Sequence, residues 1–196
     1  TKNGNAYGFI ATRAYGIGNK INSIITMPAS GIGSAISTIV GQNIGAGQQD
    51  RADKAYHYAL RMGALFLLFF GLILSRRFIS QAMVTFFSTD ERVIPLATDF
   101  LSLMAFWCWS NAFYNVTQGL FQGSGHTMIT MIVDASRIWI FRLLTLWVCA
   151  NVLNMGVESV WYAVVISNGT SAAILYGLYW TGIWKKSTIK IEKTEG

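Results

Sequence analysis

Four side-chain amides recur in this sequence at the spacing of one helical face. Asn111, Asn115, Gln118 and Gln122 follow one another at intervals of four, three and four residues, and Tyr114 lies among them. Residues at these intervals share one face of an α-helix. An amide can exchange hydrogen bonds with water, ions or solutes without a fixed charge, so a transport pathway is the favoured interpretation. The alternative is a set of interhelical hydrogen bonds that only hold a bundle together.

A pair of oppositely charged residues is the second feature that could take part in chemistry. Asp134 and Arg137 are three residues apart, so both side chains lie on one face of a helix and can form an ion pair. A structural ion pair and part of a proton relay both fit this spacing.

Signatures of enzymes do not occur in the chain. The sequence has no P-loop, HExxH or GxSxG pattern, and His57, His126, Cys108 and Cys149 lack the spacing of metal ligands. The spacing of the residues brings no nucleophile, cluster of metal ligands or pair of carboxylates together at one site. We therefore expect no enzyme activity, no metal site and no bound cofactor.

The elements that must position these residues are membrane helices. Of the 196 residues, 53% are hydrophobic and only 12% are charged, whereas soluble domains carry about 25% charged residues. The net charge of +6 would suit nucleic acid, but the basic residues stand at the ends of apolar runs rather than on one soluble face. The sequence therefore predicts a membrane protein in contact with lipid headgroups, with no nucleic acid partner.

The apolar runs predict five transmembrane helices, because one span needs about 20 mostly apolar residues. Their approximate ranges are 8–43, 55–74, 95–122, 128–153 and 157–184. The first range is too long for one perpendicular span, so it must tilt, project from the bilayer or kink at Pro28. The last two are joined by a short segment at 154–156 and must be antiparallel neighbours. The expected fold is all-α: a polytopic membrane helix bundle over 1–184, followed by a basic tail at 185–196.

The distribution of basic residues predicts the orientation. With five spans, seven basic residues fall on one side and three on the other. The first set comprises Arg51, Lys54, Arg61, Lys185, Lys186, Lys190 and Lys193, and the second comprises Arg76, Arg77 and Arg92. Because Lys and Arg favour the cytoplasmic side, we expect an integral plasma-membrane protein, in the bacterial inner membrane, with a cytoplasmic C-terminus and tail.

Small residues predict where helices approach closely. A stripe of glycine, alanine and serine runs along the first span, and Gly119 and Gly123 form a GxxxG motif at the end of the third. Tight packing within the bundle is favoured over a dimer face.

Several motifs resemble those of the MATE (multidrug and toxic compound extrusion) transporters. The most specific is VGQNIGAG at 40–47, followed by the basic-Ala pair at 51–52. The further matches are AYGIGNKI at 14–21, Met27-Pro28 with Gly31, QGSGHT at 122–127, WIFR at 139–142, and Trp161-Tyr162-Ala163 after Gly156. The resemblance covers almost the whole chain.

The resemblance implies a fold of twelve helices in two six-helix lobes, in which VGQNxGAG ends the eighth helix on the cytoplasmic side. The five spans are then helices eight to twelve, and the chain is a fragment of the C-terminal lobe whose partner is the missing N-terminal lobe of the same protein. It also implies antiport, in which an Na⁺ or H⁺ gradient drives export of cationic amphipathic compounds by alternating access of two lobes. A flippase for lipid-linked saccharides, which has a similar fold, is one alternative, and a non-transporting scaffold is another.

The resemblance also bears on individual residues. Sodium-coupled members carry an acidic residue on the tenth helix, and an ungapped count places Asn111 at that position, a departure from the sodium-coupled pattern. We expect the substrate and ion pathway to be lined by Asn111, Tyr114, Asn115, Gln118 and Gln122.

A structural and gating motif is expected where the first span ends. Its members are Pro28, Gly41, Gln42, Asn43, Gly45 and Gly47. Glycine tolerates positive φ, so the chain can turn sharply there. The side chains of Gln42 and Asn43 are expected to satisfy the terminal carbonyls of the helix.

Overall fold

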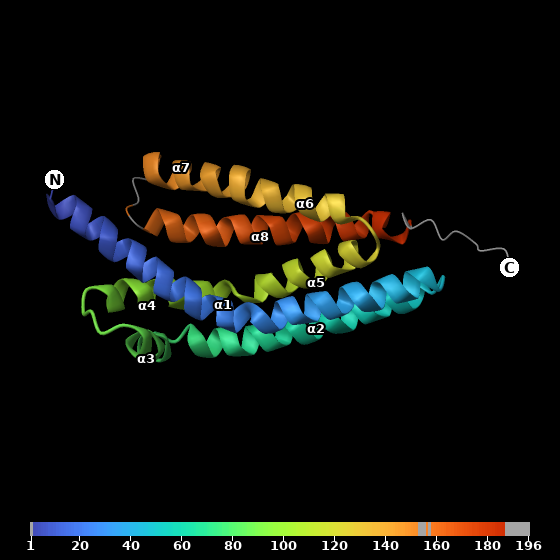
Figure 1. Ribbon diagram of the computed structural model, residues 1–196, viewed down its shortest axis with the longest axis horizontal. Helices are drawn as coiled ribbons and strands as arrows, with labels where there is room; N and C mark the ends of the chain where they lie inside the picture. The colour runs from blue at the N-terminus through green and yellow to red at the C-terminus, as the bar shows by residue number, and fades with distance from the viewer. Residues whose placement is uncertain (1, 153–155, 157, 187–196) are drawn as a thin grey trace.

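The computed structural model describes residues 2–152, 156 and 158–186, and this part of the chain is helical without strands (Figure 1). The elements are α1 (Lys2–Gly45), α2 (Gln49–Leu74), α3 (Arg77–Phe87), α4 (Val93–Trp107), α5 (Trp109–Gly123), α6 (Thr127–Ser136), a π-helical segment (Arg137–Arg142), α7 (Leu143–Asn151), α8 (Glu158–Trp180) and a 3₁₀ turn (Ile183–Lys185). The predicted all-α membrane bundle is confirmed. The expected tail residues from 187 onward, including Lys190 and Lys193, lie outside the described residues.

The helices form long rods that lie side by side (Figure 1). Among the described residues, α1 from Phe9 onward and α2 are long and apolar enough to cross a membrane, and α4 with α5 makes a third candidate if this bent pair is one span. The rod of α6, the π segment and α7 runs beside α8 (Figure 1). These two rods occupy the places of the fourth and fifth expected spans.

Helix α5 lies at the centre of the bundle, because it packs against α1, α2 and α8. The GxxxG motif makes its contact with α1 close. A Cβ atom added at Gly119 would collide with the backbone of Gly33, and one at Gly123 would collide with the backbone of Ser37. A Cβ at Gly33 would lie 2.5 Å from the Asn115 carbonyl oxygen. The small residues therefore serve an intramolecular seam between α1 and α5.

Helix α1 contains Pro28, and its first half runs at an angle to its second half (Figure 1). Proline removes one backbone hydrogen bond and crowds the preceding turn, so a bend there is expected.

The end of α1 is a tight backbone turn at Gly47, which has a φ of +72°. The Gln48 amide donates to the Asn43 carbonyl at 2.7 Å and the Gly47 amide donates to the Ile44 carbonyl at 3.0 Å. This pair of bonds is the Schellman arrangement, which requires a residue that tolerates positive φ. The side chains of Gln42 and Asn43 were expected to satisfy the terminal carbonyls of α1. This expectation is corrected, because the backbone amides of Gly47 and Gln48 do so. The Asn43 side chain instead donates to Ile39 O, one turn earlier, at 2.8 Å.

The third expected span is broken, because α4 and α5 meet at a bend of 54°. The Cys108 thiol at the bend donates to the Leu67 carbonyl of α2 at 3.1 Å. Gly71 of α2 permits this approach, since a Cβ there would lie 2.5 Å from the Ala105 carbonyl oxygen. Contact with α2 thus stabilises the bend. The sequence has no glycine or proline at Cys108 that would have predicted it.

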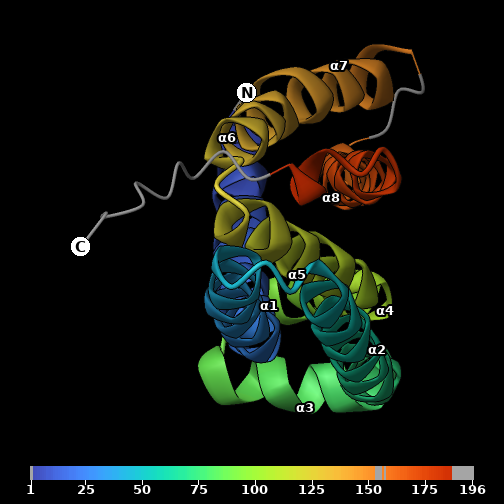
Figure 2. The same ribbon diagram turned by 90° about the vertical axis from the view of Figure 1, so that its right-hand side faces the viewer.

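The segment between the second and third spans contains α3, a helix that the sequence analysis did not predict. It runs crosswise to the long rods on one side of the bundle, next to α4 (Figure 2). Its buried residues are Ser80 and Val84, while Phe78 and Phe86 are exposed. A short helix with this division of faces is typical of a membrane interface.

Candidate functional site

A cluster of four polar side chains lies between α5 and the rod that begins with α6. Tyr114 and Gln118 come from α5, Asp134 from α6 and Arg137 from the π segment. The Tyr114 hydroxyl donates to Asp134 Oδ1, and Gln118 Nε2 donates to Asp134 Oδ2 at 2.8 Å. Arg137 Nη2 lies 3.3 Å from Asp134 Oδ1. We call these four residues the polar cluster.

The polar cluster is held together by more than the ion pair. Tyr114 is buried with 6% of its surface exposed, and the guanidinium carbon of Arg137 lies 4.6 Å from the centre of its ring. Gln118 Nε2 is also 3.3 Å from the Tyr114 hydroxyl. The side chains of Asp134 and Arg137 are 34% and 23% exposed. The carboxylate is therefore partly exposed on the surface of this lobe, although each of its three partners offers it a hydrogen.

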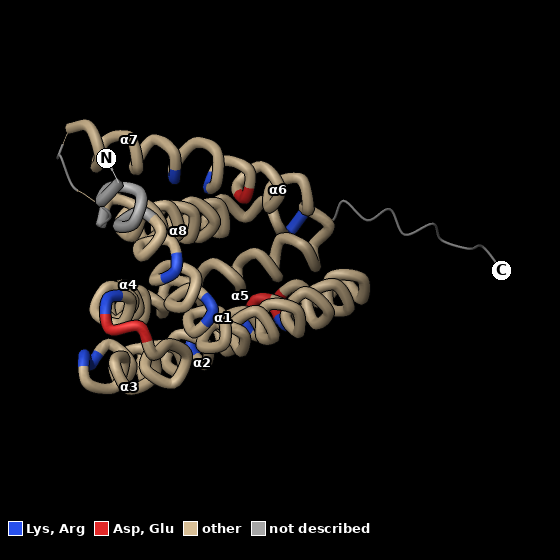
Figure 3. The backbone as a smooth tube through the Cα atoms, turned by 60° about the vertical axis from the view of Figure 1, so that its left-hand side comes forward, with Lys and Arg blue, Asp and Glu red and all other residues tan. Residues whose placement is uncertain are grey.

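The spacing of three residues places Arg137 beside this carboxylate, and the π segment that begins at Arg137 also carries a second arginine, which faces α8. Arg142 Nε lies 3.5 Å from the hydroxyl of Ser167. Figure 3 shows that the charges of the rod from α6 to α7 are gathered in one stretch. A π-helical turn is rare and occurs frequently at functional sites. No periodicity in the sequence predicted it.

The structure divides the five α5 residues that were expected to line a pathway, Asn111, Tyr114, Asn115, Gln118 and Gln122. Gln118 and Tyr114 join the polar cluster, whereas the Asn115 side chain donates to the Asn111 backbone carbonyl at 2.7 Å and stays on its own helix. The Asn111 side chain is half-buried and that of Gln122 is exposed. The members share a helix, but only two of the five reach a partner on another helix.

A second polar group, which the sequence analysis missed, connects α2 with α8. The Tyr179 hydroxyl donates to Asp53 Oδ1 at 2.6 Å, and its ring stacks on Tyr56 at a centroid distance of 4.6 Å. The hydroxyls of Tyr56 and Thr117 are 3.0 Å apart, which ties the group to α5. The residues lie far apart in sequence, so no local spacing pointed to them.

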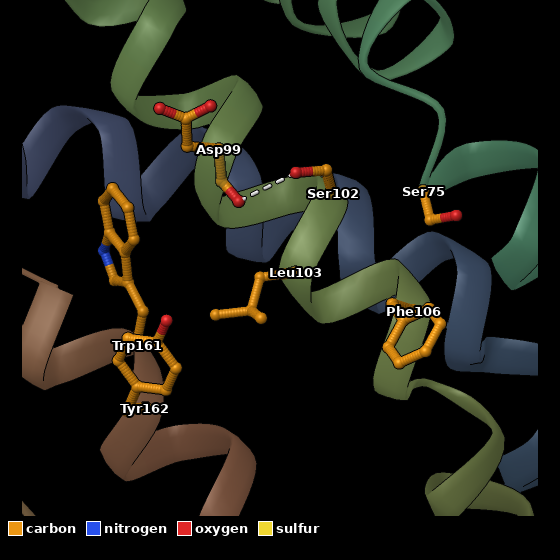
Figure 4. Close-up of a pocket in the computed structure, with 7 residues that line it drawn as sticks. All are labelled: Ser75, Asp99, Ser102, Leu103, Phe106, Trp161 and Tyr162. Carbon is orange, nitrogen blue, oxygen red and sulfur yellow. Dashed lines mark hydrogen bonds between the residues drawn. The ribbon is translucent and has the colours of Figure 1, made fainter.

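A hollow of about 450 Å³ lies between α4 and α8, toward the end of the bundle where α3 is found (Figure 4). Its lining combines Ser75, Asp99, Ser102, Leu103, Phe106, Trp161 and Tyr162. The Asp99 carboxylate lies 3.1 Å from Arg77 Nη2 of α3. No group of three or more His, Cys, Asp or Glu side chains that could hold a metal occurs within the described ranges.

The sequence model of the family described as MatE matches residues 5–148. The chain is 26% identical over 189 residues to the "Probable multidrug resistance protein YoeA" of Bacillus subtilis, a match that covers 94% of this chain and 39% of that protein. It is 22% identical over 182 residues to the "Probable multidrug resistance protein NorM" of Thermotoga maritima, covering 93% of this chain and 39% of that protein. Human "Multidrug and toxin extrusion protein 1" is 24% identical over 180 residues, covering 92% of this chain and 31% of that protein.

The fold is similar to that of solved transporters. The crystal structure of the eukaryotic MATE transporter AtDTX14 superposes with a TM-score of 0.81 at 20% identity, covering 91% of this chain and 39% of that one. An inward-facing MATE family transporter gives a TM-score of 0.75 at 18% identity, covering 92% of this chain and 41% of that one. The chain thus spans about two fifths of the length of these relatives.

Proposed function

The chain belongs to the MATE family of membrane transporters, and from this premise we propose that it is part of a secondary active multidrug efflux antiporter. The complete transporter exports cationic amphipathic compounds in exchange for Na⁺ or H⁺, by alternating access between this lobe and an N-terminal lobe of the same protein. The chain covers 39% of YoeA and 39% of NorM. This partial coverage supports the presence of a partner lobe in the complete protein.

The polar cluster is the observation that carries this proposal. Ionisable side chains inside a membrane bundle are costly, and they commonly mark pathways for ions or substrates. Asp134 keeps a partly exposed carboxylate beside the central helix α5, with Tyr114 and Gln118 fixing its position. Asn111, Asn115 and Gln122 extend the polar lining along the same helix.

We further propose that the protein lies in the plasma membrane with its C-terminus in the cytoplasm. Arg51 and Lys54 lie near the start of α2, and Lys185 and Lys186 lie past the end of α8, at the same end of the bundle (Figure 1). This end is opposite α3, which follows Arg76. The position of Arg51, Lys54, Lys185 and Lys186 beside the ends of the spans supports a cytoplasmic location for the first end.

Efflux of ethidium from cells that express the complete transporter tests the function. We expect efflux that stops when one gradient, of Na⁺ or of H⁺, is collapsed. The double variant Asn111→Leu/Gln118→Leu is expected to lose export at unchanged membrane abundance. Gln81→Leu, an exposed amide on α3, is the matched control and should export normally. Full, ion-coupled export by the double variant would contradict the pathway assignment.

A wild-type transporter that is inserted in the membrane but exports no cation would contradict the proposed antiport. That result would favour the flippase for lipid-linked saccharides.

A further inference from the structure

We propose that the groove between α8 and the bent pair of α4 and α5 binds one phospholipid with an ethanolamine headgroup. The headgroup lies in the hollow toward α3, and an acyl chain lies in a second, apolar hollow farther along α8. This lipid site is separate from the polar cluster and does not depend on which ion or compound the transporter carries.

The first hollow offers hydrogen-bond acceptors beside a negative charge. Figure 4 shows Asp99 and Ser102 next to each other on α4, with α8 opposite. The Ser102 hydroxyl donates to the Asp99 carbonyl at 3.0 Å, so its oxygen keeps only lone pairs for a ligand. The same holds for Ser75, whose hydroxyl donates to the Leu72 carbonyl at 2.9 Å. Such a lining favours a primary ammonium group, which has N–H donors and no acceptor.

A positive charge for the lipid phosphate lies next to the same carboxylate. Arg77 Nη2 is 3.1 Å from Asp99 Oδ1, and the Arg77 side chain is 72% exposed, so other donors of its guanidinium are open to a ligand. A guanidinium can bind phosphate through two parallel hydrogen bonds. Because an exposed ion pair contributes little to stability, sharing its charges with a ligand costs the fold little. A short ethylene link joins the phosphate and ammonium of an ethanolamine lipid, which matches these neighbouring opposite charges.

The second hollow, of about 330 Å³, is apolar. The described residues that line it carry no charge and are Trp107, Trp109, Ser110, Phe113, Gly169, Ala172, Ala173 and Tyr176. Phe106 lines the first hollow and Trp107 lines the second, and these adjacent residues are 51% and 40% exposed. The two hollows therefore follow one another along the α4 side of the groove.

One face of α8 runs through both hollows. Its members recur at intervals of seven, four and three residues and are Tyr162, Gly169, Ala173 and Tyr176. A Cβ atom added at Gly169 would meet no atom within 4 Å, so the groove is open at this point. The two hollows thus form one groove with a charged part and an apolar part, in the order of the parts of a phospholipid.

The groove lies at the depth that a lipid requires. The first hollow is toward the end of the bundle at α3, whose exposed Phe78 and Phe86 are typical of a membrane interface. Trp161 and Tyr162, which line this hollow, belong to the residue types enriched at headgroup depth. The second hollow begins at the bend near Cys108, midway along the bent pair, where the hydrocarbon region is expected.

Native mass spectrometry of the purified complete transporter tests the headgroup assignment. The transporter is first exchanged into an equimolar mixture of dioleoyl phosphatidylethanolamine and dioleoyl phosphatidylcholine, in which methyl groups replace the N–H donors. We expect one retained lipid, with the ethanolamine lipid favoured about tenfold, since hydrogen bonds to a charged group contribute about this factor. Asp99→Asn should lower the preference to less than about twofold. Asp90→Asn, at the pair with Arg92, lines neither hollow and should keep the preference of the wild type.

A second comparison tests the apolar part of the groove. Gly169→Leu fills the second hollow and should lower retention of both lipids about tenfold, because the acyl chain loses its apolar contacts. Gly177→Leu changes an α8 glycine outside both hollows and should retain lipid as the wild type does. Glycerophosphoethanolamine, which has the headgroup without acyl chains, should not displace the bound lipid at equal concentration.

Four outcomes overturn the inference. Equal retention of the two lipids by the wild type, or an unchanged preference in Asp99→Asn, contradicts the headgroup assignment. Displacement of the lipid by glycerophosphoethanolamine contradicts the acyl-chain assignment. A wild type that retains neither lipid contradicts the site as a whole. None of these measurements depends on export, so each outcome leaves the proposed antiport untouched.

Discussion

Two carboxylate–guanidinium pairs of nearly equal length occupy different settings in this molecule. The pair of Asp99 and Arg77 measures 3.1 Å, with side chains 47% and 72% exposed, and lies between α4 and α3. The pair of Asp134 and Arg137 measures 3.3 Å, with side chains 34% and 23% exposed. Only the second carboxylate also receives hydrogen bonds from side chains of another helix.

The difference shows that the distance between opposite charges does not reveal their role. An exposed pair contributes about 0–1 kcal/mol, because water and salt screen it. The Asp99–Arg77 pair therefore links α3 to α4 only weakly. The Asp134 carboxylate is positioned by Tyr114 and Gln118 as well as by Arg137, so its charge state is coupled to how α5 and α6 pack.

The largest effect is expected from separating α1 from α5, the helix that carries Tyr114 and Gln118 of the polar cluster. Gly119→Leu places a side chain where the backbone of Gly33 lies and should separate α1 from α5. Overpacking of this kind costs about 3 kcal/mol or more when backbone must move. We expect a lower Tm and reduced abundance in a thermal-shift measurement on the complete transporter.

Gly177→Leu is the control for that experiment, because Gly177 is exposed and a Cβ there meets no atom within 4 Å. Equal Tm values for the two variants would show that the seam does not support α5.

The next effect compares the two arginines. Arg137→Gln leaves the partly buried Asp134 without its guanidinium and should slow ethidium efflux about a hundredfold, the equivalent of about 3 kcal/mol. Arg77→Gln removes an exposed partner and should change efflux less than about twofold. Efflux rates per transporter in the membrane measure both. Similar losses in the two variants would remove the distinction between the pairs.

The smallest effect compares two amides of α5. Gln118→Leu removes one hydrogen bond to a charged group, worth about 1.5 kcal/mol, and should slow efflux about tenfold. Gln122→Leu changes an exposed side chain one turn away that has no charged partner, and it should slow efflux by less than about twofold. The same assay measures this pair, and a greater loss for Gln122→Leu would place the pathway nearer the end of α5.

Much of the fold could be predicted from local patterns. The apolar runs predicted the all-α membrane bundle, and the glycine at 47 lies at a turn with positive φ. The GxxxG spacing predicted close packing but could not identify Gly33 and Ser37 as its contacts. Helix α3 was missed because its 11 residues are too short for a span. The bend at Cys108 was missed because the hydrogen bond found there joins Cys108 to Leu67 on another helix, and local sequence patterns do not indicate such a contact.

The sequence by itself determined the family, the helical class, and the spacing that allows Asp134 and Arg137 to meet, since all three depend on which residues follow one another along the chain. The tertiary structure alone decided that Tyr114 and Gln118, and not Asn111 or Gln122, reach Asp134. Helical periodicity fixes which residues share a face. The direction in which that face points depends on how α5 packs between α1, α2 and α8, and that packing follows from the shapes of all four helices together.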